Sequence, residues 1–128
     1  PLELVLVKTP SGFRLGLESF SPAGYATMIA INDNYADGRD MSWLRDVDFD
    51  SLRTAGVAEI SGVRAYDMAL RVQYDEVAVS HIDVSISRAL KHFINANSTK
   101  PKRIYCTYTA MLAIRRELAK ITDVEEVS

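Results

Sequence analysis

The sequence predicts an α/β fold in which helices cover a mainly parallel β-sheet. Short apolar runs rich in β-branched and aromatic residues alternate along the chain with segments of helical periodicity. Strand–helix–strand alternation gives right-handed βαβ units, and these place the strands parallel in one sheet. The 128 residues are enough for one domain with a sizeable core, and 48% apolar and 25% charged residues are ordinary for a soluble globular domain.

Five strands alternate with five helical segments in this prediction. The strands cover residues 2–7, 25–32, 57–61, 78–84 and 103–107. The helices cover residues 12–20, 50–55, 64–74, a segment that begins after Ser85, and 108–120. Ser11 and Ser85 are the predicted caps of the first and fourth helices. Asp48 and Asp50 are the predicted capping residues of the helix at 50–55, which ends at Gly56. The helix after Ser85 has the clearest pattern, with apolar residues at positions 86, 89, 90, 93 and 94. Residues 122–128 are expected to form a frayed acidic tail.

The composition excludes several classes of protein. One cysteine and two histidines rule out a disulfide framework and a Cys/His structural zinc site, so no metal ligand set is expected. No apolar run approaches the ~20 residues of a membrane span, and no leader is present, which fits a cytoplasmic protein. The net charge of −2 favours no nucleic-acid partner. The chain opens at Pro1 rather than Met, so we expect residues 1–128 to be one domain excised from a longer protein.

Functional residues are expected where strands end. In parallel sheets, ligands bind beyond the carboxyl ends of the strands. The segments that leave these ends are residues 8–12, 32–43, 61–64 and 107–109. His81 is predicted within a strand and His92 within a helix, so neither lies at this edge. Cys106 is expected to be a small buried residue rather than a nucleophile, because no histidine is predicted beside it.

The acidic segment after the second strand is the most unusual feature. Six of the ten aspartates lie between residues 33 and 50, with only two arginines among them. A calcium loop is one interpretation, but the third and twelfth ligand positions hold Tyr35 and Leu44. A second interpretation is an ionised Asp beside Arg39 that orients a catalytic imidazole supplied by another subunit. The third is that the aspartates only cap helices and solvate a loop.

Two weaker signals concern anions. Lys8 and Thr9 precede the first helix and would contact a phosphate there, although neither G-x-x-x-x-G-K-[ST] nor G-x-G-x-x-G occurs in the chain. Residues 88–120 carry eight basic residues and one acidic residue. Most of these basic residues are expected on solvated helix faces; the candidates for a polyanion-binding patch are Lys91, Lys100, Lys102 and Arg103.

The segment from Ile31 to Trp43 contains D-G-R-D-M-S-W and resembles the signature of the C-terminal domain of the MurT family. Members of this family are the Mur-ligase-like subunits of lipid II isoglutaminyl synthases. The resemblance continues through D-V-D-F at 46–49, S-G-V-R-A at 61–65, M-A-L-R at 68–71 and T-Y-T-A-M at 107–111. It covers nearly the whole chain in consistent order, and the D-G-R-D-x-S-W core is its most specific part.

The resemblance implies a Rossmann-like fold of the Mur ligase C-terminal type, with a sheet of about five or six strands. It also implies a partner, a GatD-type class I glutamine amidotransferase that releases ammonia with a Cys–His pair. With ATP and Mg²⁺ in the full-length subunit, the enzyme would amidate the D-glutamate α-carboxylate of lipid II or a muropeptide precursor to D-isoglutamine. Asp40 would complete the partner's catalytic triad, and the residues that support the loop and dock the partner would be Asn32, Asp33, Asp37, Gly38, Arg39, Ser42 and Trp43.

The chain also departs from the family pattern. Thr9 and Ser11 replace the Asn and Ala of the family's K-N-P-A-G, which weakens the case for a nucleotide contact there. The P-loop and zinc ribbon of the complete subunit are absent, so this chain alone should neither hydrolyse ATP nor ligate a substrate. Two further hypotheses stay open: a non-catalytic docking module that binds an amidotransferase, and a metal- or polyanion-binding domain.

Overall fold

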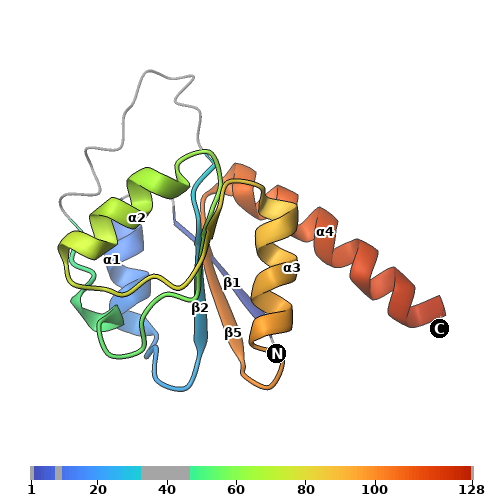
Figure 1. Ribbon diagram of the computed structural model, residues 1–128, viewed down its shortest axis with the longest axis horizontal. Coiled ribbons are helices and arrows are strands. Elements are labelled where there is room, and N and C mark those ends of the chain that lie inside the picture. The colour runs from blue at the N-terminus through green and yellow to red at the C-terminus, as the bar shows by residue number, and fades with distance from the viewer. Residues whose placement is uncertain (1, 8–9, 33–46, 128) are drawn as a thin grey trace.

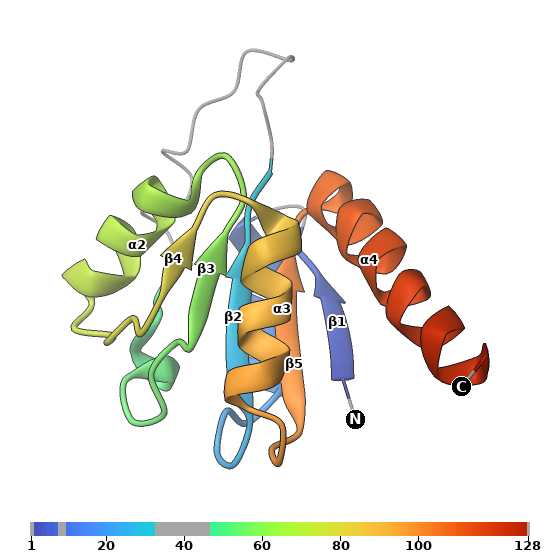
Figure 2. The same ribbon diagram turned by 45° about the vertical axis from the view of Figure 1, so that its right-hand side comes forward.

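A single sheet of five parallel strands organises the part of the chain that the structure describes. The computed structural model describes residues 2–7, 10–32 and 47–127, with side chains left out at residues 10–11 and 121–127. The strands are β1 (Leu2–Leu6), β2 (Ala26–Ala30), β3 (Glu59–Ser61), β4 (Ile82–Asp83) and β5 (Lys102–Cys106). Their order across the sheet is β1-β5-β2-β3-β4, so the last strand in sequence lies between the first two. Figure 2 shows this arrangement, with the short strand β4 at one edge and β1 at the other.

Helices cover both faces of the sheet. They are α1 (Pro10–Ser19), α2 (Ala65–Tyr74), α3 (Ile86–Ala96) and α4 (Tyr108–Val127), with a short 3₁₀ helix, η2, at Asp50–Leu52. Figure 1 shows the sheet nearly edge-on, with α1 and α2 on one side and α3 and α4 on the other. The described residues contain no helix with both the length and the apolar character needed to cross a membrane.

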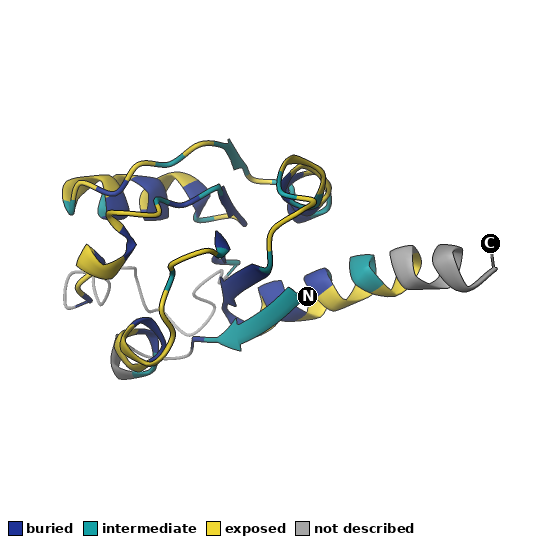
Figure 3. Ribbon diagram, turned by 90° about the horizontal axis from the view of Figure 1, so that it is seen from below, coloured by how far each residue is buried: buried dark blue, intermediate teal, exposed yellow. Residues whose placement is uncertain are grey.

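Two apolar cores result from the alternation of side chains along the strands. On β5, Tyr105 joins the core under α1 and α2, whereas Ile104 and Cys106 join the core under α3 and α4. Every residue of β2 and β5 is buried, which is expected for central strands covered on both faces. Figure 3 shows that the buried positions of the helices face the sheet. These cores hold the strand ends, and thus the candidate site, in place.

The predicted α/β class and parallel sheet are confirmed, with five strands. The Ser85 cap is also confirmed, because its side chain accepts a hydrogen bond from the Arg88 backbone N–H. Gly56 follows η2, has a φ of 74° and donates its backbone N–H to the Leu52 carbonyl. This is the conformation expected of a glycine that ends a helix.

Several predicted boundaries were wrong. α1 begins at Pro10, so Ser11 lies in its first turn rather than before it, because proline suits the first helical position. β3 and β4 are shorter than predicted, and His81 precedes β4 instead of lying within it. α4 continues to Val127, where the predicted frayed tail contains no Gly or Pro to stop it.

Candidate functional site

The candidate site is the carboxyl edge of the sheet where the chain leaves β2. Residues 33–46 lie outside the described residues, and so do Lys8 and Thr9. The predicted contributions of Asp33, Asp37, Gly38, Arg39, Asp40, Ser42 and Trp43 therefore remain predictions. Asn32 is the one predicted site residue in the described part, and the structure shows how both ends of the 33–46 segment are held.

Asn32 joins three strand ends. Its backbone N–H donates to Thr107 Oγ1 at 3.1 Å, and its carbonyl accepts from Thr109 Oγ1 at 3.0 Å. Its side-chain Oδ1 accepts from the Val63 backbone N–H at 3.2 Å. The end of β2 is thus tied to the β3–α2 turn on one side and to the β5–α4 turn on the other. The role of Asn32 in supporting the loop stays a prediction, because residues 33–46 lie outside the described residues.

Gly62 lets the β3–α2 turn approach β2 closely. It has a φ of 98°, and an added Cβ would lie 2.1 Å from the Ile31 carbonyl oxygen. That oxygen accepts a hydrogen bond from the Arg64 backbone N–H at 3.2 Å. A side chain at position 62 would therefore disrupt both the turn and the end of β2.

The described chain resumes at Val47, and residues of α2 and its carboxyl-terminal end bind Val47 and Phe49. Arg71 donates to the Val47 carbonyl, and its guanidinium lies 5.1 Å from the centre of the Phe49 ring. Asp75 pairs with Arg71 at 3.0 Å, and its Oδ2 also accepts from the Phe49 backbone N–H at 3.0 Å. Both charged side chains are largely buried, at 15% and 16% exposure, so removing one of them leaves the other charge buried without its partner and costs more than breaking a surface pair.

The contacts of the Arg71–Asp75 pair with Val47 and Phe49 form a clamp that the sequence prediction missed. The spacing of Arg71 and Asp75 is the i, i+4 spacing of a helical ion pair and could have indicated the pair itself. It could not indicate that the pair binds a segment more than twenty residues earlier.

Asp48 behaves close to its predicted capping role, because its Oδ1 accepts from the Asp50 backbone N–H at 2.8 Å. Asp50 does not cap with its side chain but pairs with Arg53 at 2.9 Å.

The described residues at this edge provide support rather than reacting groups. Asn32 Oδ1, Thr107 Oγ1 and Thr109 Oγ1 each take part in a hydrogen bond within the protein. Cys106 is fully buried, and burial raises the pKa of its thiol to about 12, so it is not a nucleophile at neutral pH. His81 and His92 both contact Glu59, the first residue of β3, and therefore lie away from the carboxyl edge.

The alternative of a polyanion-binding patch is not supported by the positions of the basic residues. Arg103 is 4% exposed, pairs with Glu3 and donates to the Ser21 carbonyl. Lys102 is 9% exposed and donates to the Lys100 carbonyl. Two of the four residues of the proposed patch are therefore buried and bound within the protein, because both lie on β5, an interior strand of the sheet.

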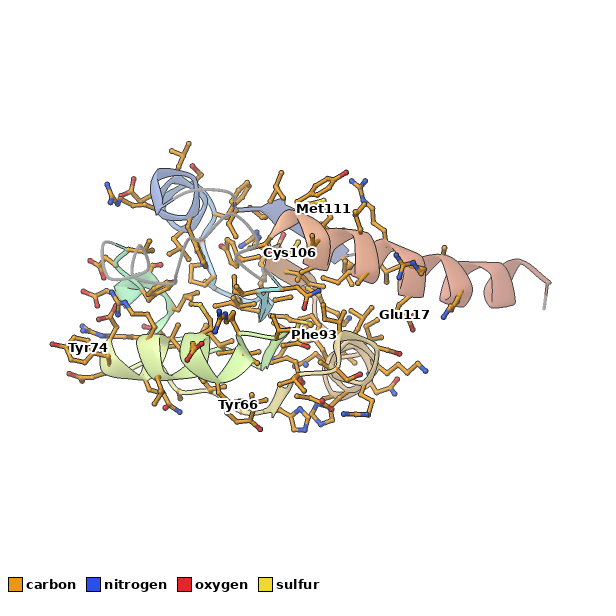
Figure 4. All side chains as sticks on the ribbon, turned by 90° about the horizontal axis from the view of Figure 1, so that it is seen from above. Tyr66, Tyr74, Phe93, Cys106, Met111 and Glu117 are labelled. Atoms are coloured by element: carbon orange, nitrogen blue, oxygen red, sulfur yellow. The ribbon has the colours of Figure 1, made fainter. Side chains whose placement is uncertain are left out.

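An apolar stripe lies on α2, the helix that holds the returning end. Tyr66, Leu70 and Tyr74 are spaced four residues apart and are 61%, 69% and 84% exposed. Figure 4 shows Tyr66 on the side of α2 away from the sheet and Tyr74 projecting beyond the carboxyl-terminal end of the helix. The opposite side of this helix is buried in the core through Met68 and Val72. Exposed apolar side chains in such a row are typical of a protein-binding surface.

The comparisons with known proteins agree on one family. The model of the family described as "MurT ligase C-terminal" matches residues 6–111. The lipid II isoglutaminyl synthase (glutamine-hydrolyzing) subunit MurT of Streptococcus pneumoniae is 34% identical over 122 residues, which cover 91% of this chain and 27% of that protein. The protein of the same name from Staphylococcus aureus is 37% identical over 78 residues, covering 58% of this chain and 18% of the relative. The chain thus spans about a quarter or less of the curated relatives it matches.

Proposed function

Because the chain belongs to the MurT ligase C-terminal family, we propose that it acts as the C-terminal domain of a lipid II isoglutaminyl synthase subunit. Its five-stranded parallel sheet with helices on both faces is the Rossmann-like fold of a Mur ligase C-terminal domain. The proposed reaction is the amidation of the D-glutamate α-carboxylate of the peptidoglycan stem peptide to D-isoglutamine. ATP and Mg²⁺ would activate that carboxylate in the full-length subunit, and glutamine hydrolysis by a partner would supply the ammonia.

The proposed partner is a GatD-type class I glutamine amidotransferase, which carries the catalytic Cys and His. The S. pneumoniae relative is named as a subunit, which supports the existence of a partner. In the proposal, the Asp40 carboxylate accepts a hydrogen bond from the partner's imidazole. This bond selects the tautomer that can take the thiol proton, and the negative charge stabilises the imidazolium that forms. Arg39 beside it would keep Asp40 ionised.

The observation that carries this proposal is the pair of anchors at the base of the 33–46 segment. Asn32 binds one end to two neighbouring strand ends, and the Arg71–Asp75 pair binds the other end to α2. An aspartate that completes a catalytic group on another subunit must be held to within a fraction of an ångström, and fixing the residues on either side of its segment serves that need. The exposed stripe on α2 offers the partner an adjacent docking surface.

Lys8 and Thr9, the proposed phosphate contacts, lie outside the described residues. A nucleotide contact in this domain therefore stays a prediction, and we derive no step through ATP.

The test is the glutaminase activity of the full-length subunit expressed with its amidotransferase. Asp40→Asn should lower kcat at least about 100-fold, because the amide leaves the imidazole in the wrong tautomer, a change that costs ~10⁴-fold in the serine-protease example. Asp50→Asn, which removes an exposed aspartate with no proposed part in catalysis, is the matched control and should keep the wild-type rate. Equal rates for Asp40→Asn and wild type would refute the catalytic role.

The alternative proposal is a non-catalytic docking module, which the exposed stripe on α2 favours. It makes a different prediction for the same variants. Asp40→Asn would then bind the amidotransferase with unchanged affinity and leave glutamine turnover unchanged, whereas the catalytic proposal requires turnover to fall while binding persists.

A further inference from the structure

Glu59, His81 and His92 form a cluster on the α3 side of the sheet, distinct from the carboxyl edge. Glu59 is the first residue of β3 and is fully buried. Its Oε2 lies 2.6 Å from His81 Nδ1, just before β4, and its Oε1 lies 2.9 Å from His92 Nδ1 in the middle of α3. The two imidazole rings are stacked, with centroids 3.9 Å apart and planes 23° from parallel.

The carboxylate of Glu59 is negatively charged and fully buried, so a bound cation would stabilise it. A carboxylate with no exposed surface is stable only when hydrogen bonds and positive charge replace its lost hydration. The described contacts of the Glu59 carboxylate are both with imidazole nitrogens. Arg88, one turn before His92 on α3, is bound through two nitrogens to Asp83 instead. Two imidazoles that share one carboxylate cannot both be protonated without repulsion between the stacked rings.

The donor set is one that binds transition metals. Two imidazole nitrogens and a carboxylate oxygen are the protein ligands of several zinc sites and of other first-row divalent sites. One ligand atom from each residue lies within 4.8 Å of the others. The side chains of His81 and His92 are 38% and 49% exposed, so an ion and its water ligands can reach the cluster from solvent.

We propose that Glu59, His81 and His92 bind one divalent transition-metal ion, with water in the remaining coordination positions. We assign Nδ1–H of each imidazole as the donor to Glu59 in the metal-free protein. On binding, each ring takes the tautomer with its proton on Nε2, and the Nδ1 lone pair ligates the ion. The rings must also turn out of the stacked arrangement, because an ion lies near the plane of each imidazole that ligates it and these planes are stacked only 23° from parallel. Their exposure leaves room for this rotation.

The ion would join three elements at the β4 edge of the sheet. β4 has two residues and pairs only with β3 among the described strands. A metal bound by one residue of β3, one before β4 and one on α3 cross-links the edge strand to the sheet and to the helix above it. Metal binding should therefore raise the thermal stability of the folded chain.

The experiment uses chelator-treated protein of the present 128-residue sequence, with Zn²⁺ as the probe. Titration calorimetry should give one zinc per chain, and zinc should raise Tm. His81→Gln and His92→Gln should each weaken binding at least about 100-fold, since even residues that only support a metal ligand change affinity ~10–100-fold. Both histidines are partly exposed, so these variants should fold, as circular dichroism will check. Binding should strengthen from pH 5.5 to 7.5, because protons compete for the imidazoles.

Asp50→Asn is the matched control, because Asp48, Asp50 and Asp75 also bring carboxylates together and offer zinc a competing site. It should leave zinc affinity unchanged. Co²⁺ bound to the wild-type chain should add visible absorption that both histidine variants lose. Wild-type affinity in the His81→Gln, His92→Gln double variant would place the ion elsewhere and overturn the proposal, as would the absence of zinc binding up to millimolar concentration.

Discussion

At the residue scale, Gly62 and Asn32 decide how closely two neighbouring strand ends approach. Gly62 supplies a backbone conformation and a space that no other residue supplies, and Asn32 supplies the hydrogen bonds across the gap. The sequence drew attention to both positions, because each lies in a segment leaving a predicted strand. Their contacts could not be predicted, since they depend on which strands become neighbours.

Gly62→Ala should be strongly destabilising. The positive φ alone costs about 1 kcal/mol for alanine, and the contact at 2.1 Å from the Ile31 oxygen forces the backbone to move as well. The expected loss in the free energy of unfolding is about 3 kcal/mol or more, measured by urea denaturation. Gly24→Ala is the matched control, because Gly24 has a φ of 80° with nothing within 4 Å of an added Cβ. Equal losses for both variants would show that the close approach to Ile31 is unimportant.

At the scale of elements, α2 both fills the core and fixes the chain that follows the 33–46 segment. Its inner face fills the core through Met68 and Val72, and its carboxyl-terminal turn holds the chain at Val47 and Phe49 through Arg71 and Asp75. The helical prediction for residues 64–74 found the element with little error. It did not reveal the clamp, because the partners of Arg71 and Asp75 lie in an irregular segment with no periodicity.

Asp75→Asn should reduce stability by about 1–3 kcal/mol. The change removes the charge from a largely buried ion pair and weakens an acceptor of the Phe49 N–H. Asp67→Asn, in an ion pair with Arg64 whose side chains are 38% and 53% exposed, should cost less than about 0.5 kcal/mol. Urea denaturation of both variants measures the difference. A loss for Asp75→Asn as small as that for Asp67→Asn would mean that the clamp contributes little.

At the scale of the whole molecule, the proposed activities occupy separate surfaces. The anchors of the 33–46 segment lie at the carboxyl edge, the apolar stripe lies on the outer side of α2, and the Glu59–His81–His92 cluster lies between β3, β4 and α3. Figure 4 shows that the labelled core residues Phe93 and Cys106 lie inside, between these surfaces. Changes on one surface should therefore leave the others intact.

Leu70→Asp should weaken association with the amidotransferase partner at least about tenfold if the stripe on α2 is the docking surface, because the interface would have to desolvate the added carboxylate. Leu70 is 69% exposed, so the variant should keep the stability of the free protein. Leu15→Asp on α1, at a residue with 64% exposure, is the matched control and should bind normally. Calorimetry with the full-length subunit measures both affinities. Unchanged affinity for Leu70→Asp would place the docking surface elsewhere.

The sequence by itself determined the α/β class, the parallel sheet and the family. These follow from local patterns: apolar periodicity, a capping serine at 85, a helix-ending glycine at 56 and a contiguous motif at 37–43. Local patterns depend on neighbours in the chain, and those can be read in order.

Only the tertiary structure decided the rest, because it brings distant residues together. It placed β5 between β1 and β2, which put Thr107 and Thr109 beside Asn32. It also joined Glu59, His81 and His92, which are too far apart in sequence to form a recognisable metal motif, at a buried carboxylate. Strand order sets these contacts, and strand order is determined by the packing of both cores rather than by any one segment.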